Sequence, residues 1–254
     1  MFSRLTASAL VLASVVWQAN ADEAPPAGGS TNFILIDYGI NLSADGDETE
    51  TLSLGTGDVA SGETELLLND GIIDDSSGFV GIGFGHRYAN NIGAILRYET
   101  GEFDSGTLNI QIAPGSAFTA ADASAMSTEV ESFMVEGAYF IPYSEKVELW
   151  GLVGLGQSEV TTANSSATVT EGGTETSFTA MCERSEDNSA TRFGVGATYY
   201  MNQTQGFYGG VMLTNYGDAK FNAVENGACT NRPDTLSVKD IESTDLRIGF
   251  FRSF

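Results

Sequence analysis

Eight segments of about ten residues, in which apolar residues alternate with glycine or charged residues, constrain this sequence more than any other feature. An alternation with period two predicts β-strands, because successive side chains of a strand point to opposite faces. In most of the segments one face is wholly apolar, whereas the other face mixes glycine with charge. The segments are 32–41, 78–88, 92–101, 131–141, 147–156, 191–201, 206–216 and 244–254.

The length of these segments predicts that they cross a membrane. About ten residues is what one tilted transmembrane strand requires. No stretch after residue 21 has the apolar length of a membrane helix, so a membrane-spanning chain must cross with strands. Since open sheet edges cannot face lipid, we predict an all-β fold, an antiparallel up-and-down transmembrane barrel of eight strands. The alternative is a soluble secreted β-sandwich, whose half-buried sheets also have one apolar face.

The connections between the segments alternate strictly between short and long. The short ones are 89–91, 142–146 and 202–205, and the long ones are 42–77, 102–130, 157–190 and 217–243. This asymmetry is typical of outer-membrane barrels, which have short periplasmic turns and long extracellular loops. We therefore predict that the long loops are extracellular and the short turns periplasmic. Aromatic residues cluster near the short turns and predict an interfacial girdle there. They are Tyr88, Tyr139, Phe140, Tyr143, Tyr199, Tyr200, Phe207 and Tyr208.

The last strand carries a more specific pattern. The chain ends in Phe254, and Phe250, Ile248 and Leu246 occupy alternating positions before it. With this ending and its eight segments, the chain resembles the superfamily of eight-stranded outer-membrane β-barrels, the OmpA-like and opacity-protein-like barrels. The resemblance covers residues 32–254, and Arg252 departs from the usual apolar or aromatic residue. It implies location in the bacterial outer membrane, surrounded by lipid and lipopolysaccharide, and recognition of the terminal pattern by the barrel-assembly machinery. We expect a monomer.

The N-terminus predicts export. Arg4 precedes an apolar run over 5–17, and Ala19 and Ala21 form a small-x-small cleavage site. This arrangement is typical of a secretory signal peptide, and the run is too short to span a bilayer as a helix. We predict cleavage after Ala21, the alternative being an N-terminal membrane anchor. The expected organisation is a signal peptide over 1–21, a short periplasmic segment over 22–31 and a barrel domain over 32–254.

Composition excludes several functions. A formal net charge of −23 argues against nucleic-acid binding, which needs a basic face. His86 is the only histidine and lies by a short turn, so no Ser-His-Asp set can form at the loop end. We expect neither enzymatic activity nor a cofactor. The first long loop holds ten acidic residues and no Lys or Arg, which predicts a solvated surface or a place where divalent cations bind loosely.

The two cysteines predict one disulfide. Cys182 lies in the third long loop and Cys229 in the fourth, and an even count is typical of a disulfide in an exported protein. Two free thiols are the alternative.

Four charged residues fall near mid-membrane on the inward face. Asp37 and Arg247 lie on the first and last strands, which are neighbours once the barrel closes, and Arg97 and Glu136 lie on the third and fourth strands. Unpaired charges in a narrow lumen are costly, so we predict two ion pairs that form a plug.

Two functional interpretations follow from a plugged barrel. The first is a non-enzymatic surface barrel with an envelope-structural or surface-interaction role. The alternative is a narrow gated channel for ions or small solutes, which opens when the ion pairs exchange partners. Eight strands enclose too little space for a general diffusion pore, and the fold alone does not decide between the two.

Overall fold

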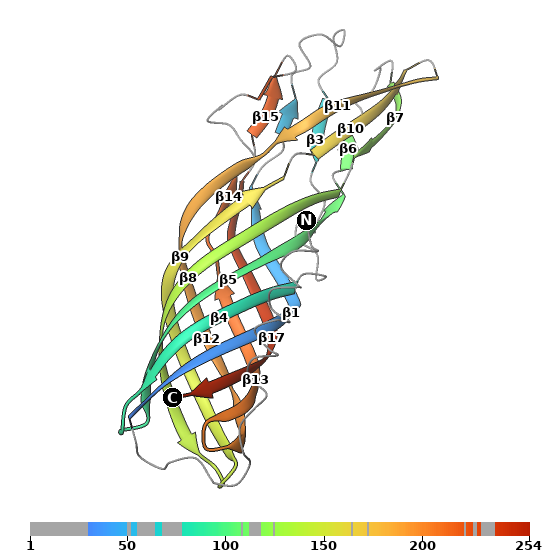
Figure 1. Cartoon of the computed structure of the whole chain (residues 1–254). Coiled ribbons are helices and arrows are strands. Elements are labelled where there is room, and N and C mark those ends of the chain that lie inside the picture. The colour runs from blue at the N-terminus through green and yellow to red at the C-terminus, as the bar shows by residue number, and fades with distance from the viewer. Residues whose placement is uncertain are drawn as a thin grey trace.

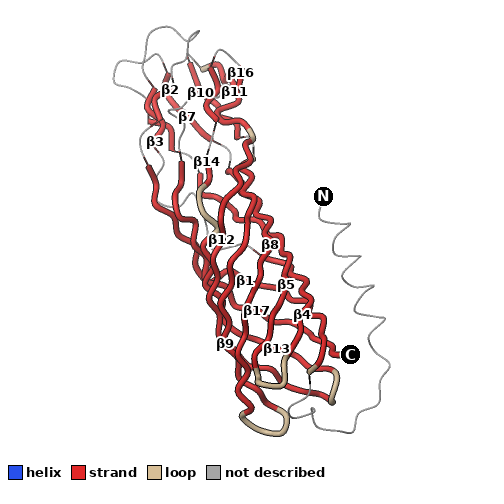
Figure 2. Tube along the Cα trace, turned by 90° about the vertical axis from the view of Figure 1, so that its left-hand side faces the viewer, coloured by secondary structure: helices blue, strands red, loops and turns tan. Residues whose placement is uncertain are grey.

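The computed structural model describes residues 30–49, 52–54, 64–67, 78–107, 109–111, 118–123, 125–163, 165–171, 173–220, 222–225, 228–229 and 237–254. The predicted signal peptide, with Ala19 and Ala21, lies outside these residues. All regular structure in the described part is β-strand (Figure 2). Among the described residues, no helix is long and apolar enough to cross a membrane.

Eight antiparallel strands close into a barrel (Figure 1). Each strand pairs with the next along the chain, and the first and last strands pair with each other over Phe33–Ser253 to Thr49–Ser237. The strands are β1 (Thr31–Thr49), β4 (Gly78–Arg87), β5 (Ile92–Thr107), β8 (Ala125–Pro142), β9 (Val147–Thr162), β12 (Arg184–Asn202), β13 (Gln205–Asn215) and β17 (Ser237–Ser253). The predicted all-β closed barrel is therefore confirmed.

Several strands extend well beyond the predicted segments. β1 and β12 each have 19 residues and β8 has 18, whereas about ten suffice to cross a bilayer. The extra residues lie at the end away from the short turns, so the predicted loop boundaries at 42, 102, 130, 157, 190 and 243 are wrong. The predicted alternation ended there because the outward side chains turn polar. The backbone hydrogen-bond ladder continues, because it does not depend on which side chains face out.

This change in the outward face marks the edge of an apolar band. On β8, outward Phe133 and Val135 are each 53 % exposed, and the next outward position towards the loop end is Glu131. On β12, outward Phe193 is followed by Thr191 in the same direction. The barrel is thus apolar on the outside over the band, which is the surface that a lipid surrounding requires.

Shorter strands continue from the barrel at the loop end (Figures 1 and 2). One sheet has the order β16-β15-β11-β10-β7, a second has the order β2-β3-β6, and β14 (Ala219–Lys220) extends the barrel beside β17. Their bounds are β2 (Leu52–Leu54), β3 (Thr64–Leu67), β6 (Asn109–Gln111), β7 (Phe118–Ala123), β10 (Ser165–Glu171), β11 (Thr174–Cys182), β15 (Asn222–Glu225) and β16 (Ala228–Cys229). The three predicted short connections are turns, at 88–91, 143–146 and 203–204.

Candidate functional site: a closed lumen

Charged side chains fill the middle of the lumen. The exposed fractions of Asp37, Arg97, Glu136 and Arg247 are 3 %, 2 %, 1 % and 1 %. All four predicted residues point inward, and they meet as expected from the strand order. Arg247 Nη1 lies 3.1 Å from Asp37 Oδ1, and Arg97 Nε lies 3.0 Å from Glu136 Oε1. Arg97 also pairs with Asp37, so the two predicted pairs are joined.

Two further residues, Glu99 and Arg192, turn this chain of contacts into a closed ring. Arg192 Nη1 lies 3.1 Å from Glu136 Oε1, and the same guanidinium pairs with Glu99. Glu99 Oε2 in turn lies 3.0 Å from Arg247 Nη1. Carboxylates and guanidiniums therefore alternate all the way round. The six members, in order, are Asp37, Arg97, Glu136, Arg192, Glu99 and Arg247. We call this set the ion-pair ring.

Asp245 is attached to the ion-pair ring but does not belong to it. Its Oδ2 accepts a hydrogen bond from Arg247 Nη2 at 3.0 Å and one from Ser243 at 3.3 Å, while its Oδ1 has no partner among the described residues. The buried cluster therefore holds four carboxylates and three guanidiniums. The fourth carboxylate is Asp245, and the ring closes without it.

Glycine explains how six long polar side chains fit inside eight strands. A Cβ on Gly81 would lie 2.7 Å from Asp37 Oδ1, and a Cβ on Gly39 would lie 2.6 Å from Arg247 Nε. A Cβ on Gly154 would lie 3.1 Å from the Glu136 side chain. The inward glycines thus leave the volume that the neighbouring charged side chains occupy.

An aromatic layer covers the ion-pair ring on the loop side. Phe79, Phe103 and Tyr216 have no exposed area, and their ring centroids lie 5.3 to 6.0 Å apart. Tyr216 donates a hydrogen bond to Glu99 at 3.0 Å, and the Arg247 guanidinium lies 5.1 Å from the Phe79 ring centroid. The layer therefore rests directly on the charges and separates them from the loop end.

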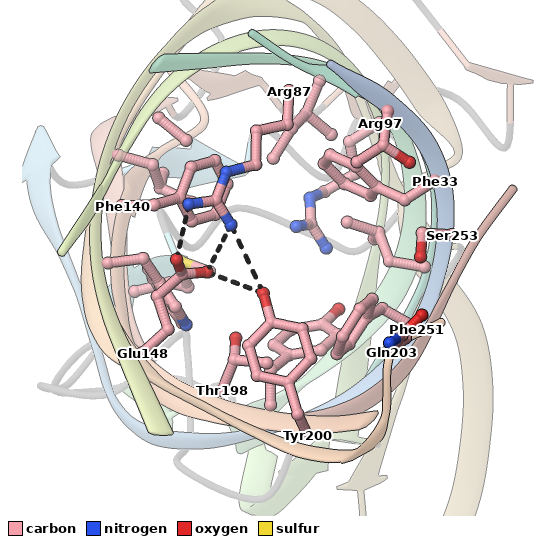
Figure 3. A pocket seen from close by; sticks show the side chains of 18 residues that line it. Phe33, Arg87, Arg97, Phe140, Glu148, Thr198, Tyr200, Gln203, Phe251 and Ser253 are labelled. Atoms are coloured by element: carbon pink, nitrogen blue, oxygen red, sulfur yellow. Dashed lines mark hydrogen bonds and ion pairs between the residues drawn. The ribbon is translucent and has the colours of Figure 1, made fainter. Parts of the chain in front are cut away.

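Below the ion-pair ring, on the short-turn side, the lumen opens into a cavity of about 90 Å³ (Figure 3). Its inner end is formed by Arg97 and by Tyr208, whose hydroxyl donates to Asp37. Trp150 lies against one wall, over Gly196 and Gly210, where a Cβ would come within 2.3 Å and 2.5 Å of the indole. The wall is mainly apolar, because most of it is the core cluster of the lower barrel.

Three residues cross the mouth of this cavity (Figure 3). Arg87 of β4 reaches across to β9, where its Nη2 lies 2.7 Å from Glu148 Oε1. Tyr200 of β12 donates to Glu148 Oε2 at 2.7 Å, and Arg87 Nη1 donates to the Tyr200 hydroxyl at 3.4 Å. Phe140 lies beneath the guanidinium, with its ring centroid 4.9 Å away. We call Arg87, Glu148 and Tyr200 the mouth triad.

The structure corrects part of the predicted aromatic girdle. Tyr88, Tyr139, Tyr143, Tyr199 and Phe207 are exposed on the outside as expected, but Phe140, Tyr200 and Tyr208 line the cavity. Their position in the strand alternation already placed them inward, since each is separated from an outward residue by an odd number of positions. Grouping aromatics by depth alone missed this.

The other predicted residues lie apart from the lumen. The predicted assembly signal lies on or near the outward side of β17 and consists of Leu246, Ile248, Phe250 and Phe254. The Phe254 amide donates a hydrogen bond to the Asn32 carbonyl at 2.9 Å. His86 hydrogen-bonds to Asn32 at 2.7 Å and to Ser30 at 2.8 Å.

At the loop end, Cys182 is buried and disulfide-bonded, whereas the side chain of Cys229 lies outside the described residues. Nearby, Glu186 contacts Arg184 and, at 3.1 Å, Lys220. Burial alone would raise the pKa of Glu186, but these two hydrogen-bonded cations outweigh it and lower the pKa. Within the described residues, no three His, Cys, Asp or Glu side chains are grouped to hold a metal.

The barrel is similar to solved structures of outer-membrane proteins. The chain is similar to OprG of Pseudomonas aeruginosa, with 14 % identity, a TM-score of 0.51 and coverage of 92 % of this chain and 99 % of OprG. It is also similar to a major outer membrane protein of Thermus thermophilus, at 10 % identity, a TM-score of 0.46 and coverage of 88 % and 99 %. The outer membrane protease OmpT of Escherichia coli matches at 9 % identity, a TM-score of 0.41 and coverage of 89 % and 96 %.

No protein-family model matches the chain, and no curated protein sequence matches it. The likeness to OprG establishes the fold: this chain has the architecture of the eight-stranded outer-membrane β-barrels.

Proposed function

We propose that this protein is a non-enzymatic barrel of the bacterial outer membrane whose lumen is closed, and whose role is structural or lies in surface interactions. The observation that carries the proposal is the stack of the ion-pair ring and the aromatic layer. Six charged side chains span the lumen, and three fully buried aromatic rings cover them on the loop side. This stack blocks a continuous water path along the barrel axis.

The strands that continue past the apolar band support a surface role. They carry two further sheets beyond the level at which the outward face becomes polar. In the proposed orientation this end is extracellular and the short turns are periplasmic. Lipid and lipopolysaccharide surround the band, the barrel-assembly machinery recognises the ending at Phe254, and the acidic loops attract divalent cations. We propose that the barrel acts as a monomer, because closure leaves no sheet edge along the β1–β17 seam with which a partner could pair.

A narrow gated channel is the second candidate. The observation that favours it is the cavity, which reaches Arg97 from the short-turn side. The ion-pair ring, the aromatic layer and further buried side chains on the loop side, such as Val130, Val160 and Ile241, then separate the two ends of the lumen. If the ring members exchanged partners and the side chains above them moved aside, a narrow path would open.

Planar-bilayer conductance separates the two candidates. For the closed barrel, the wild-type protein should show no single-channel events, and Arg247→Ala should introduce them, because it removes the side chain that joins three carboxylates. Arg252→Ala, on the same strand but outside the ring, is the matched control and should stay silent. Frequent openings of the wild-type protein would support the channel. Heat-modifiable migration on a denaturing gel should accompany either result, and its absence would reject a membrane barrel.

A further inference from the structure

The cavity below the ion-pair ring has the features of a binding site. We propose that it takes the end of one unbranched alkyl chain whose head group is uncharged and forms hydrogen bonds. This inference goes beyond the closed-barrel proposal and does not depend on whether the lumen conducts. Apart from Arg97, the side chains that line the cavity belong neither to the ion-pair ring nor to the loop-end sheets.

The wall of the cavity selects hydrocarbon. Pockets that bind small molecules are mostly apolar, with a few polar groups at fixed positions. Here nine of the lining side chains are apolar, and they come from strands all round the barrel. They are Phe33, Leu35, Ile95, Ala138, Phe140, Trp150, Leu152, Met212 and Phe251. Water in such a space finds few hydrogen-bond partners, so its displacement by an apolar group is favourable.

The two ends of the cavity argue against a charged ligand. At the inner end, Arg97 is already shared between Asp37 and Glu136. At the mouth, Arg87 is paired with Glu148. Between these pairs, the mouth is lined by neutral hydroxyl groups of Thr31, Thr198 and Ser253. A hydroxyl or amide head meets partners there, whereas a carboxylate would meet no cation that lacks a counter-charge among the lining residues.

The size of the cavity fits one chain. On β1 the lining runs from Thr31 to Leu35, and four residues at roughly 3.3 Å each, tilted by about 45°, give a depth of about 9 Å. A volume of about 90 Å³ over that depth is narrow. It accommodates one chain end and excludes the paired chains of a phospholipid. The mouth triad crosses only part of the opening, as Figure 3 shows.

Trp150 makes binding measurable. In a chain that begins at Asp22 it is the only tryptophan, and its side chain lines the cavity. The probe is a terminally brominated n-alkanol, added to the protein in nanodiscs of unbrominated lipid. Saturable quenching of Trp150 fluorescence is expected. The same chain ending in a carboxylate should quench only at higher concentration, and brominated phospholipid should quench without saturation.

Two alanines provide a matched pair of variants. Ala138 of β8 lines the cavity, whereas Ala94 of β5 faces outward on the neighbouring strand. Ala138→Leu fills the space and should weaken quenching by about tenfold, while Ala94→Leu should leave it unchanged. Leu152→Ala enlarges the cavity and should accept a brominated ring that the wild-type protein excludes. Heat-modifiable migration checks that each variant is folded.

Some outcomes overturn the proposal. If quenching by the alkanol does not saturate, or if Ala138→Leu and wild type quench alike, the alkanol acts from the bilayer and the cavity is not its site. Tighter binding of the carboxylate than of the alkanol would reject the uncharged head group. If the wild-type barrel conducts but quenching is saturable and weakened by Ala138→Leu, the closed-barrel proposal is rejected and the binding site stands.

Discussion

Two aspartates of the lumen should respond very differently to the same substitution. Asp37 lies in the ion-pair ring, where it pairs with Arg97 and Arg247 and accepts a hydrogen bond from Tyr208. Asp37→Asn puts an NH₂ group against guanidinium donors and leaves both arginines short of counter-charge. Breaking a buried ion pair in this way costs about 3–5 kcal/mol. Asp37→Asn should therefore lower the free energy of unfolding by about that amount.

Asp245→Asn is the matched control at similar burial. Asp245 contacts one guanidinium, and its Oδ1 has no partner among the described residues. An asparagine oxygen can still accept hydrogen bonds from Arg247 and Ser243. The substitution removes the carboxylate that lies outside the ion-pair ring and is in excess over the three guanidiniums. We expect the free energy of unfolding to change by less than about 1 kcal/mol.

Urea unfolding of the barrel in lipid vesicles, followed by Trp150 fluorescence, measures both variants. Equal losses of stability would refute the argument that the closed ring is the stabilising unit. A larger loss of unfolding free energy for Asp245→Asn than for Asp37→Asn would show that Asp245, and not the closed ring, stabilises the barrel.

Three further predictions concern the loops and the chain end. Protease added to intact cells should cut only within the long connections, and cleavage at Asn90 or Gln203 would contradict the proposed orientation. Non-reduced protein should show no free thiols, since Cys182 and Cys229 are predicted to pair, and two reactive thiols would exclude the bond. Closing this loop of nearly fifty residues stabilises the fold by about 4 kcal/mol in the chain-entropy model. Deletion of Phe254 should reduce the amount of heat-modifiable barrel in the outer membrane, and normal assembly would show that the terminal aromatic is not the recognised feature.

The alternation of apolar and glycine-rich faces was enough to predict the eight barrel strands, their order and the inward position of the four charged residues. Asp37 and Arg247 could be paired from the sequence because barrel closure makes the first and last strands neighbours. Arg192 and Glu99 were missed as ring members, although both have the inward position in their strands. Their contact depends on which side chains reach across the lumen, and strand adjacency does not contain that information, since β5 and β12 are not paired.

The strand ends and the cavity were also beyond the sequence pattern. A polar outward face looks like a loop whether or not the backbone ladder continues, as on β12 above Thr191. The cavity depends on the packing of Trp150 against Gly196 and Gly210, which the sequence pattern does not specify. The mouth triad joins β4, β9 and β12 across the opening, and no local spacing marks it.

The closed ring of charges also orders the assembly of the barrel in time. Asp37 lies on the first strand and Arg247 on the last, 210 residues later, so the ring stays open until the final strand docks against the first. Contacts so distant in sequence form late, because loop closure must come before them. Until then Asp37 and Glu99 each lack one of their two guanidinium partners, and an open intermediate with incompletely paired charges is unfavourable in hydrocarbon. Docking of the last strand therefore completes the pairing of these two carboxylates in the same event that closes the wall, so that release into lipid favours the finished barrel over its unfinished precursors.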